Sequence, residues 1–403
     1  MKRTYKYYLK LTKSQKQKLE SILKNCHWLY NHLLEQFRVR DKNQQKQLTE
    51  YPLINSLPKI KESYPFLKQV HSSNLQEISK SVYKVWQKYR ELKKLDPEKK
   101  YPKFKPLHRY NSFTYSQPIE KISCGYKIDN SPLTKKKENK KLRLVLGQQN
   151  HHNVYLELKM TMERNIDSEI KILTIIRKNR RYYACFSCNE IETKPLPKVN
   201  QKVGIDVNLN KKSYITLSNG TKYKHPQHYK KVEEKLQDKN RILSRKTKKS
   251  NNWKDAKFQL AKKWEKVVNQ FKHYSYQVAN ELVKNYDNIA IENLRIDKMV
   301  KNHRLAKSIQ QARWGILFQV LAEAAEIATR QLVRVNPRNT SQTCSDCGEL
   351  AQEKLTLNQR IFRCWNCELE LDRDVNSARN ILNIAIKENK FDQNLPLNKE
   401  NNF

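Results

Sequence analysis

Two pairs of cysteines toward the C-terminus constrain the fold of this chain more than any other feature. Cys344 and Cys347 form the first pair, Cys364 and Cys367 form the second, and sixteen residues separate the pairs. This spacing is typical of a zinc ribbon, in which two tight turns present four thiolates to one ion. Because four thiolates leave no coordination position for water, we expect this zinc to be structural. A redox role for either pair is the alternative, although no thioredoxin-like sequence surrounds them.

The other cysteines have a different setting. Cys185 and Cys188 stand three apart in an apparent strand, where such positions point to opposite faces of the sheet. We therefore expect them, like Cys26 and Cys124, to be core or surface thiols and not metal ligands. The first residues lack the apolar core of a signal peptide, which predicts a cytoplasmic protein with reduced cysteines. No stretch approaches the roughly 20 apolar residues of a membrane span, so no membrane partner is expected.

The charge of the chain is strongly positive. Lys and Arg number 81 against 40 Asp and Glu, which gives a net charge of +41 spread along all 403 residues. Such a chain repels itself unless a polyanion neutralises it, and nucleic acid is the obvious polyanion. The even spread predicts a large bound surface. Ribosomal and chromatin proteins share this charge, so composition alone does not separate an enzyme from a binding protein.

The first half of the chain combines strand and helix patterns. Residues 4–10 alternate as in a strand, and the pattern turns helical from Thr12, with further helical pattern at about 43–63 and 72–95. Short alternating runs follow beyond Pro97 and predict a small β-barrel or sandwich, with the helices inserted after its first strand. The strongly polar residues 134–141 are expected to form a solvated loop. The expected runs are 112–116, 143–147, 153–160, 168–176 and 181–190.

The second half, beyond a boundary near residue 199, has a different order of strand and helix patterns. Three strands come first, then a long basic helical stretch, a strand, a helix, a strand, the cysteine segment and a last helix. This order is typical of an RNase H-like fold. The expected strands are 202–207, 212–217, 221–224, 288–292 and 332–335. The long basic helical stretch is expected to end at about residue 285, and two further helices are expected at 306–330 and 375–387.

Two acidic residues stand at the ends of apolar strands in this half. Asp206 ends the strand that begins at Val203, and Glu292 ends the strand that begins at Ile289. Open α/β sheets bind ligands at such strand ends. If the two strands are parallel neighbours, as the order of elements requires, the carboxylates meet. Paired carboxylates can hold two Mg²⁺ ions about 4 Å apart and support the hydrolysis of a phosphodiester.

The last helix offers two candidates for a third acid, Asp372 and Asp374. Asp374 stands four residues before Ala378, at the edge of the apolar stripe that faces the sheet. Asp372 lies off that stripe, where capping of the helix or a solvent contact is its expected role. We therefore predict that Asp206, Glu292 and Asp374 form the metal-binding active site of a nuclease.

Four segments carry a resemblance to a known family. The sequence resembles TnpB, the transposon-encoded RNA-guided endonucleases related to the type V CRISPR effectors, over nearly the whole chain. The segments are Gly204-Ile-Asp-Val-Asn-Leu-Asn, Ile291-Glu-Asn-Leu, Asn339-Thr-Ser-Gln-Thr-Cys-Ser-Asp-Cys-Gly and Asp372-Arg-Asp-Val-Asn-Ser-Ala-Arg-Asn-Ile. The family order Asp, Glu, Asp differs from the Asp, Asp, Glu order of cut-and-paste transposases on the same fold, which argues against a transposase.

The resemblance implies an α+β multidomain protein whose RuvC-type, RNase H-like nuclease domain carries an inserted zinc ribbon. A wedge β-barrel with a helical recognition insertion precedes that domain. A guide RNA read from the transposon end would pair with target DNA, double- or single-stranded, beside a short flanking motif, and Mg²⁺ and Zn²⁺ would be the metals. The implied bounds are 1–10 and 100–198 for the wedge barrel, 11–99 for the insertion, 199–337 and 372–387 for the nuclease domain, 338–371 for the ribbon and 388–403 for a disordered tail.

Basic and polar residues in three regions are candidates for nucleic-acid contacts. A heteroduplex is recognised through its backbone and charge, while helix-borne Gln and Lys can reach base edges and phosphates. A basic stretch near residue 245 would lie beside the nuclease core, and residues 298–308 could form a lid over the site. The candidates are Gln76, Lys80, Lys84, Ser112, Thr114, Tyr115, Arg245, Lys246, Lys248, Lys249, Lys301 and Arg304.

Three hypotheses follow for the activity. The first is a Mg²⁺-dependent, RNA-guided DNA endonuclease of the prokaryotic cytoplasm. The second is an RNA-guided repressor that binds DNA without cleaving it, which loss of a catalytic acid would favour, whereas all three acids are present. The third, a zinc-ribbon protein that binds nucleic acid without a guide, leaves the RNase H-like segment unexplained. The flanking motif and the oligomeric state are not predicted.

Overall fold

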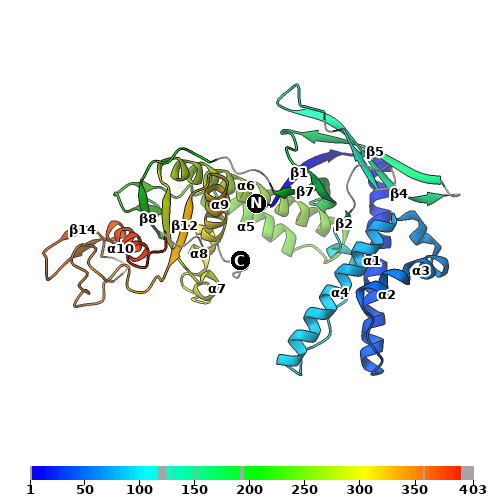
Figure 1. Ribbon diagram of the computed structural model, residues 1–403, viewed down its shortest axis with the longest axis horizontal. Helices are drawn as coiled ribbons and strands as arrows, with labels where there is room; N and C mark the ends of the chain where they lie inside the picture. The colour runs from blue at the N-terminus through cyan, green and yellow to red at the C-terminus, as the bar shows by residue number, and fades with distance from the viewer. Residues whose placement is uncertain are drawn as a thin grey trace. The chain divides into compact units, whose positions relative to one another are not determined.

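The protein folds into two compact units, residues 1–191 and 192–403. The structure is a computed structural model that describes residues 2–116, 125–129, 131–149, 152–190, 195–356 and 359–391. Cys124 and residues 392–403 lie outside this described part. Both units combine helices with sheets (Figure 1), which confirms the α+β prediction. No helix in the described ranges is long and apolar enough to cross a membrane.

The first unit is built on a seven-stranded antiparallel sheet. Its strands follow the order β2-β6-β7-β1-β5-β4-β3, so the N-terminal strand lies in the middle. The edge strands approach one another through side chains, because the rings of Tyr115 and Tyr126 lie 5.9 Å apart. The strands are β1 (Lys2–Lys10), β2 (Ser112–Tyr115), β3 (Tyr126–Ile128), β4 (Glu138–Gln149), β5 (His152–Met162), β6 (Ile170–Lys178) and β7 (Arg181–Glu190).

The helices of this unit follow β1, as predicted. A capping box starts α1, in which the Thr12 hydroxyl accepts from the Gln15 amide and the Gln15 side chain accepts from the Thr12 amide. The buried stripes of α1 and α4 face each other, with the rings of Phe37 and Trp86 stacked 5.3 Å apart. The helices are α1 (Lys13–Lys42), α2 (Glu50–Asn55), α3 (Leu57–Ser63) and α4 (Ser72–Leu95).

One expected loop is partly strand. Residues 134–141 were predicted to be a solvated loop, but β4 begins at Glu138 and the Lys140 side chain is 7% exposed. The Lys140 ammonium donates to Ser131 Oγ at 2.7 Å and lies 3.4 Å from Glu138 Oε2. These partners replace the water that a lysine normally requires, so the prediction failed because it relied on charge alone.

The second unit contains a five-stranded sheet in the order β10-β9-β8-β11-β12. The strands β8, β11 and β12 are parallel neighbours, while β9 and β10 pair antiparallel in a meander with β8. The strands are β8 (Lys202–Val207), β9 (Ile215–Leu217), β10 (Lys222–Tyr223), β11 (Asn288–Glu292), β12 (Gln331–Val335), β13 (Ile361–Arg363) and β14 (Glu370–Asp372). The helices are α5 (Glu233–Ser244), α6 (Asn251–Asn285), α7 (Ile296–Met299), α8 (Ala306–Ala312), α9 (Trp314–Ile327) and α10 (Arg373–Lys387).

The two faces of this sheet carry different helices. Alternate residues such as Val203 and Ile205 pack in one core with α6 and α9, while Ala290 packs with α10 on the other face (Figure 1). Gly204 lies under α10, and a Cβ built there would stand 2.0 Å from the carbonyl oxygen of Ala378. Glycine is therefore required for α10 to lie this close to β8.

Two further boundaries differ from expectation. The single helix predicted over 306–330 is interrupted at Arg313, which adopts a left-handed conformation with φ 52° between α8 and α9. The predicted disordered tail begins at residue 388, but Phe391 is buried with Ala385 and the Lys390 ammonium donates to Arg334 O at 2.9 Å. Residues 388–391 therefore belong to the packed unit.

Candidate active site and zinc ribbon

The three predicted acids lie on the same face of the sheet. Ile205 of β8 pairs with Ile291 of β11, so Asp206 and Glu292 follow this pair directly at the carboxyl ends of two parallel strands. Side chains alternate between the two faces of a strand, so both acids point to the face that α10 covers. Asp374 stands in the first turn of α10. The exposed fractions of the three residues are only 9%, 9% and 7%. The three acids are therefore buried near one another, and their role as a metal site stays a prediction.

Burial and mutual repulsion dominate the electrostatics of this site. Burial, followed by the charges of Glu292 and Asp374, raises the pKa of Asp206 well above its ordinary value. Burial also raises the pKa of Glu292, and a hydrogen bond from the Thr340 hydroxyl opposes this rise. Buried carboxylates that repel one another are poorly stable alone and favour bound cations. The donor set therefore fits hard divalent cations such as Mg²⁺.

Neighbouring side chains hold the acids from segments far away in the sequence. Ser213 Oγ donates to Asp374 Oδ2 at 2.8 Å, and Thr340 Oγ1 donates to Glu292 Oε1 at 2.6 Å. The Arg360 guanidinium lies 3.9 Å from Asp374 Oδ1 and is half exposed, so it adds positive charge at the rim. Our sequence reasoning missed these three residues. Thr340 at least lies in one of the segments that carry the family resemblance, which was an available signal.

Asp372 has the capping role that was expected of it. Its Oδ1 accepts hydrogen bonds from the amides of Asp374 and Val375, which marks Asp372 as the N-cap of α10. Its Oδ2 lies 2.6 Å from the Lys222 ammonium. The helix begins at Arg373, so Asp374, two residues after the cap, and not the cap itself, faces the sheet.

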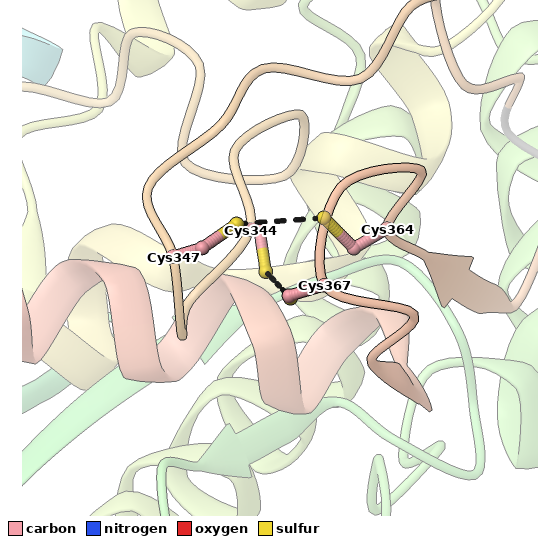
Figure 2. Close-up of side chains that lie close together, drawn as sticks. All are labelled: Cys344, Cys347, Cys364 and Cys367. Atoms are coloured by element: carbon pink, nitrogen blue, oxygen red, sulfur yellow. Dashed lines mark hydrogen bonds between the residues drawn. The ribbon is translucent and has the colours of Figure 1, made fainter.

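The four cysteines of the two pairs come together in the segment between β12 and α10. Their sulfur atoms all lie within 4.8 Å of one another, and no other group of three or more potential ligands in the described ranges does so. Figure 2 shows the two turns facing each other, with Cys344 Sγ 3.6 Å from Cys367 Sγ and Cys347 Sγ 3.5 Å from Cys364 Sγ. A tetrahedral Zn²⁺ with Zn–S bonds of about 2.3 Å requires sulfur separations of about 3.8 Å. The cluster could therefore hold a structural zinc.

The two cysteine turns are built alike. A residue with positive φ follows the second cysteine of each pair, Gly348 at 83° and Glu368 at 57°. The amide of Glu349 donates to the Cys347 sulfur and is the main reason why the pKa of that thiol is lowered to about 7. Backbone amides aimed at sulfur favour the thiolate form that binds metal. The Leu369 amide acts in this direction on Cys367, but burial and hydrogen bonds with the three neighbouring sulfurs outweigh it and raise the pKa of that thiol to about 12.

Three sequence families match parts of the chain. One described as "Probable transposase" matches residues 186–303, and one described as "Cas12f1-like, TNB domain" matches residues 314–381. A third, described as "Helix-turn-helix domain", matches residues 1–46. The second match covers the four cysteines and Asp374 together, and the first covers Asp206 and Glu292.

Relatives extend the likeness over most of the chain. A Streptomyces pristinaespiralis protein whose name describes it as an RNA-guided DNA endonuclease is 26% identical over 393 residues, 95% of this chain and 89% of its own length. The similarly named InsQ of Escherichia coli strain K12 is 27% identical over 79% of this chain and 75% of its own length. The chain is therefore similar to the TnpB family over most of its length.

Solved structures show the same fold. The protein in a Cas12f1–sgRNA–target DNA complex matches with a TM-score of 0.60 at 14% identity, over 92% of this chain and 83% of that protein. The endonuclease CRISPR-Cas phi3 matches with a TM-score of 0.52 at 10% identity, over 96% and 92% of the two chains. The helix-turn-helix description does not fit locally, because residues 2–42 form β1 and the single helix α1 of 30 residues.

The nucleic-acid candidates of the first unit do not all line the same cleft. Ser112 and Thr114 line a cleft of about 220 Å³ beside α4, together with Glu77 and Ser81. Gln76, Lys80 and Lys84 stand on α4 but do not line this cleft, and Lys80 forms an ion pair with Glu77 at 3.0 Å. Tyr115 was a wrong prediction. It is fully buried, and its hydroxyl donates to Val145 O at 3.0 Å, so it contacts the core instead of a ligand.

The candidates of the second unit are accessible. Arg245, Lys246, Lys248 and Lys249 are all exposed in the turn between α5 and α6. Lys246 and Lys248 share a groove with Trp253, whose ring the Lys257 ammonium covers at 4.8 Å from its centre. Lys301 and Arg304 are exposed between α7 and α8.

Proposed function

We propose that this chain is an RNA-guided DNA endonuclease. Guided by an RNA from a transposon end, it would cleave target DNA beside a short flanking motif. The observation that carries this proposal is the convergence of Asp206, Glu292 and Asp374 on one buried face, at the ends of two parallel strands and one helix. Relatives over most of the chain are named RNA-guided DNA endonucleases, and a solved Cas12f1 complex of the same fold contains sgRNA and target DNA.

The chemistry of the acids supports hydrolysis. Two Mg²⁺ ions, when bound by these carboxylates, would activate a water molecule and stabilise the leaving oxygen of the phosphodiester. The chain itself would hold the ligands in place, with Ser213 on Asp374 and Thr340 on Glu292. Arg360, half exposed beside Asp374, would meet the negatively charged DNA strand.

The finer architecture follows the family. We interpret the second unit as a RuvC-type nuclease domain of RNase H-like topology, with the zinc ribbon inserted between β12 and α10. The sheet of the first unit would be the wedge barrel, and α1 to α4 its helical recognition insertion. The net charge of +41 suits a protein that holds a heteroduplex by its backbone while base pairing reads the sequence.

One experiment tests the proposal. The protein is purified with RNA transcribed from the end of its own gene and is then offered guide-matched plasmids with randomised flanks in Mg²⁺. Cleavage beside one flanking motif is expected, and Asp206→Ala should abolish it. The matched control is Asp238→Ala, which removes a 55% exposed carboxylate of α5 and should leave cleavage intact.

The outcomes separate the competing functions. Guide-dependent binding without any cleavage in Mg²⁺ would overturn the nuclease proposal in favour of a repressor. Cleavage that ignores the guide sequence would overturn RNA guidance while keeping the nuclease. Binding that needs no guide at all would leave only a zinc-ribbon nucleic-acid-binding protein.

A further inference from the structure

The segment that enters the zinc ribbon also contacts the carboxylate site. Thr340, four residues before Cys344, is 5% exposed, and its hydroxyl lies 2.6 Å from Glu292 Oε1 and 3.3 Å from Pro337 O. A hydroxyl has one proton to donate, and the shorter, charge-assisted contact to the carboxylate takes it. The ribbon thus reaches into the proposed active site through one side chain.

Three asparagines of α10 anchor this entry segment. The Asn380 amide donates to Thr340 O at 2.8 Å and to Thr343 O at 2.6 Å. The Asn376 amide donates to Thr343 O at 2.7 Å, and its Oδ1 accepts from the Ser345 amide at 2.9 Å. Asn383 donates to Ser345 O at 3.0 Å.

The spacing of these asparagines places them on one strip of α10. They recur after four and three residues, and Asn376 and Asn380 are almost fully buried. Asp374 stands on the same helix two residues before Asn376. One rigid helix therefore carries the third acid and also holds the backbone on both sides of Thr343. A shift of the first cysteine turn would move Thr340 relative to Glu292.

We propose that Thr340 is the positioning residue for Glu292, and that the asparagine strip of α10 and the zinc-loaded first cysteine turn together hold Thr340 in place. A glutamate has three rotatable bonds, and a partner in the protein is needed to fix its carboxylate before a cation arrives. The ribbon would then set the geometry of the carboxylate site in addition to any contact with DNA. This inference rests on the proposed function, because it takes the three acids to be cation ligands.

Mn²⁺ binding to the full chain, loaded with zinc, tests the proposal without relying on cleavage. Free Mn²⁺ is followed by its electron paramagnetic resonance signal. Thr340→Val keeps the shape of the side chain and removes the hydroxyl, and it should weaken Mn²⁺ binding about 10- to 100-fold. Thr340→Ser restores the hydroxyl and should bind within about threefold of the wild type. Both variants should retain their zinc.

The asparagine strip has a matched pair of variants. Asn380→Ala removes the donor to Thr340 and Thr343 and should weaken Mn²⁺ binding in the same direction as Thr340→Val. Arg379→Ala is the control, because it removes an exposed side chain of the same helix that contacts Ser218 O and none of the entry segment, and it should leave Mn²⁺ binding unchanged. In cleavage assays, Thr340→Val should lower kcat and leave KM for the target unchanged, because DNA binding does not depend on the Glu292 carboxylate.

The outcomes distinguish this inference from the proposed function. If Asp206→Ala weakens Mn²⁺ binding but Thr340→Val does not, the positioning role is overturned and the carboxylate site stands. If Thr340→Val and Thr340→Ser weaken binding equally, the hydroxyl is not the cause and the inference fails as well. If even Asp206→Ala binds Mn²⁺ like the wild type, the acids are not cation ligands, and both proposals fall.

Discussion

Ser213 Oγ donates a 2.8 Å hydrogen bond to Asp374 Oδ2, although 161 positions separate the two residues. Ser213 precedes β9 and is 3% exposed, so the bond joins the β8–β9 connection to the first turn of α10 in a buried setting. A buried carboxylate requires such donors, because it has lost its contact with water. The carboxylate of Asp374 is thus held by the loop that follows the strand of Asp206.

The two neighbouring acids of α10 should respond differently to amidation. Asp374→Asn should abolish cleavage, because it removes a charge that the proposed metal site needs. Asp372→Asn should retain most of the cleavage, because asparagine caps helices about as well as aspartate, and the Lys222 ion pair that it loses is partly exposed. Plasmid cleavage rates check this pair. Equal loss in both variants would contradict the assignment of the third acid.

The close approach of α10 to β8 predicts a strong effect of one methyl group. Gly204→Ala places a Cβ 2.0 Å from Ala378 O, and we expect it to destabilise the second unit by about 3 kcal/mol or more and to abolish cleavage. Gly220→Ala is the control. Its φ of 92° costs an alanine about 1–2 kcal/mol, but no atom lies within 4 Å of the new Cβ. Thermal unfolding measures the stability of both variants. An equal loss of stability in the two would show that α10 can move away from β8 to make room for the methyl group.

Local periodicity predicted the elements that build this site, and the structure shows why. Asp206 and Glu292 stand at or next to the carboxyl ends of mainly apolar strands, and the helical phase of α10 separates Asp374 from Asp372. The buried face of each of these elements was therefore predictable from its own sequence. Alternation would also have corrected one error. Phe113 and Tyr115 share the buried face of β2, whereas Ser112 and Thr114 are the more accessible residues.

Contacts between distant segments were not predictable from such patterns. The bond between Thr340 and Glu292 joins residues 48 positions apart, and that between Ser213 and Asp374 joins residues 161 apart. A serine or threonine in a loop carries no periodic signal that names its partner. The role of Gly204 was hidden for the same reason, because it depends on which helix covers the strand. Burial of Lys140 likewise depends on a serine nine positions away.

Removal of one repelling charge should stabilise the metal-free protein. Burial and the charges of Glu292 and Asp374 raise the pKa of Asp206, so its ionised form costs folding free energy at neutral pH. Asp206→Asn should therefore raise the unfolding midpoint in EDTA at pH 7. For a gain of about 1 kcal/mol in a unit of this size, the rise is about 2–4 °C.

The pH dependence of this gain has a definite sign. Asp206 has a higher pKa in the folded than in the unfolded state, so its unfavourable contribution is complete above the folded pKa and disappears as the pH falls through it. The advantage of Asp206→Asn should shrink steadily when the unfolding midpoint is measured at lower pH. An advantage that grew toward acid pH would contradict the repulsion between the three carboxylates.

Zinc content should depend on the ribbon cysteines alone. Elemental analysis of the purified chain is expected to give about one zinc per molecule, and Cys344→Ser should lose it, because three thiolates close the site poorly. Cys185→Ser is the matched control. Cys185 belongs to no cluster of three or more potential ligands in the described part of the chain, so its loss should leave the zinc content unchanged. Zinc loss in this control would show that a second site exists in the first unit.

The exposed turn between α5 and α6 should contribute to RNA binding through charge. Lys246→Gln combined with Lys248→Gln removes two exposed cations beside Trp253 and should weaken guide RNA binding at low salt. If both lysines contact phosphates, the slope of log affinity against log salt should fall by about 1.4, since each contact contributes about 0.7 on single strands. The control Lys137→Gln removes a cation of the first unit that is already paired with Glu163 at 2.6 Å. It should leave the slope nearly unchanged.

A weaker affinity with an unaltered salt slope in the double variant would instead point to a change in the shape of the turn, since the loss of phosphate contacts must appear in the salt dependence.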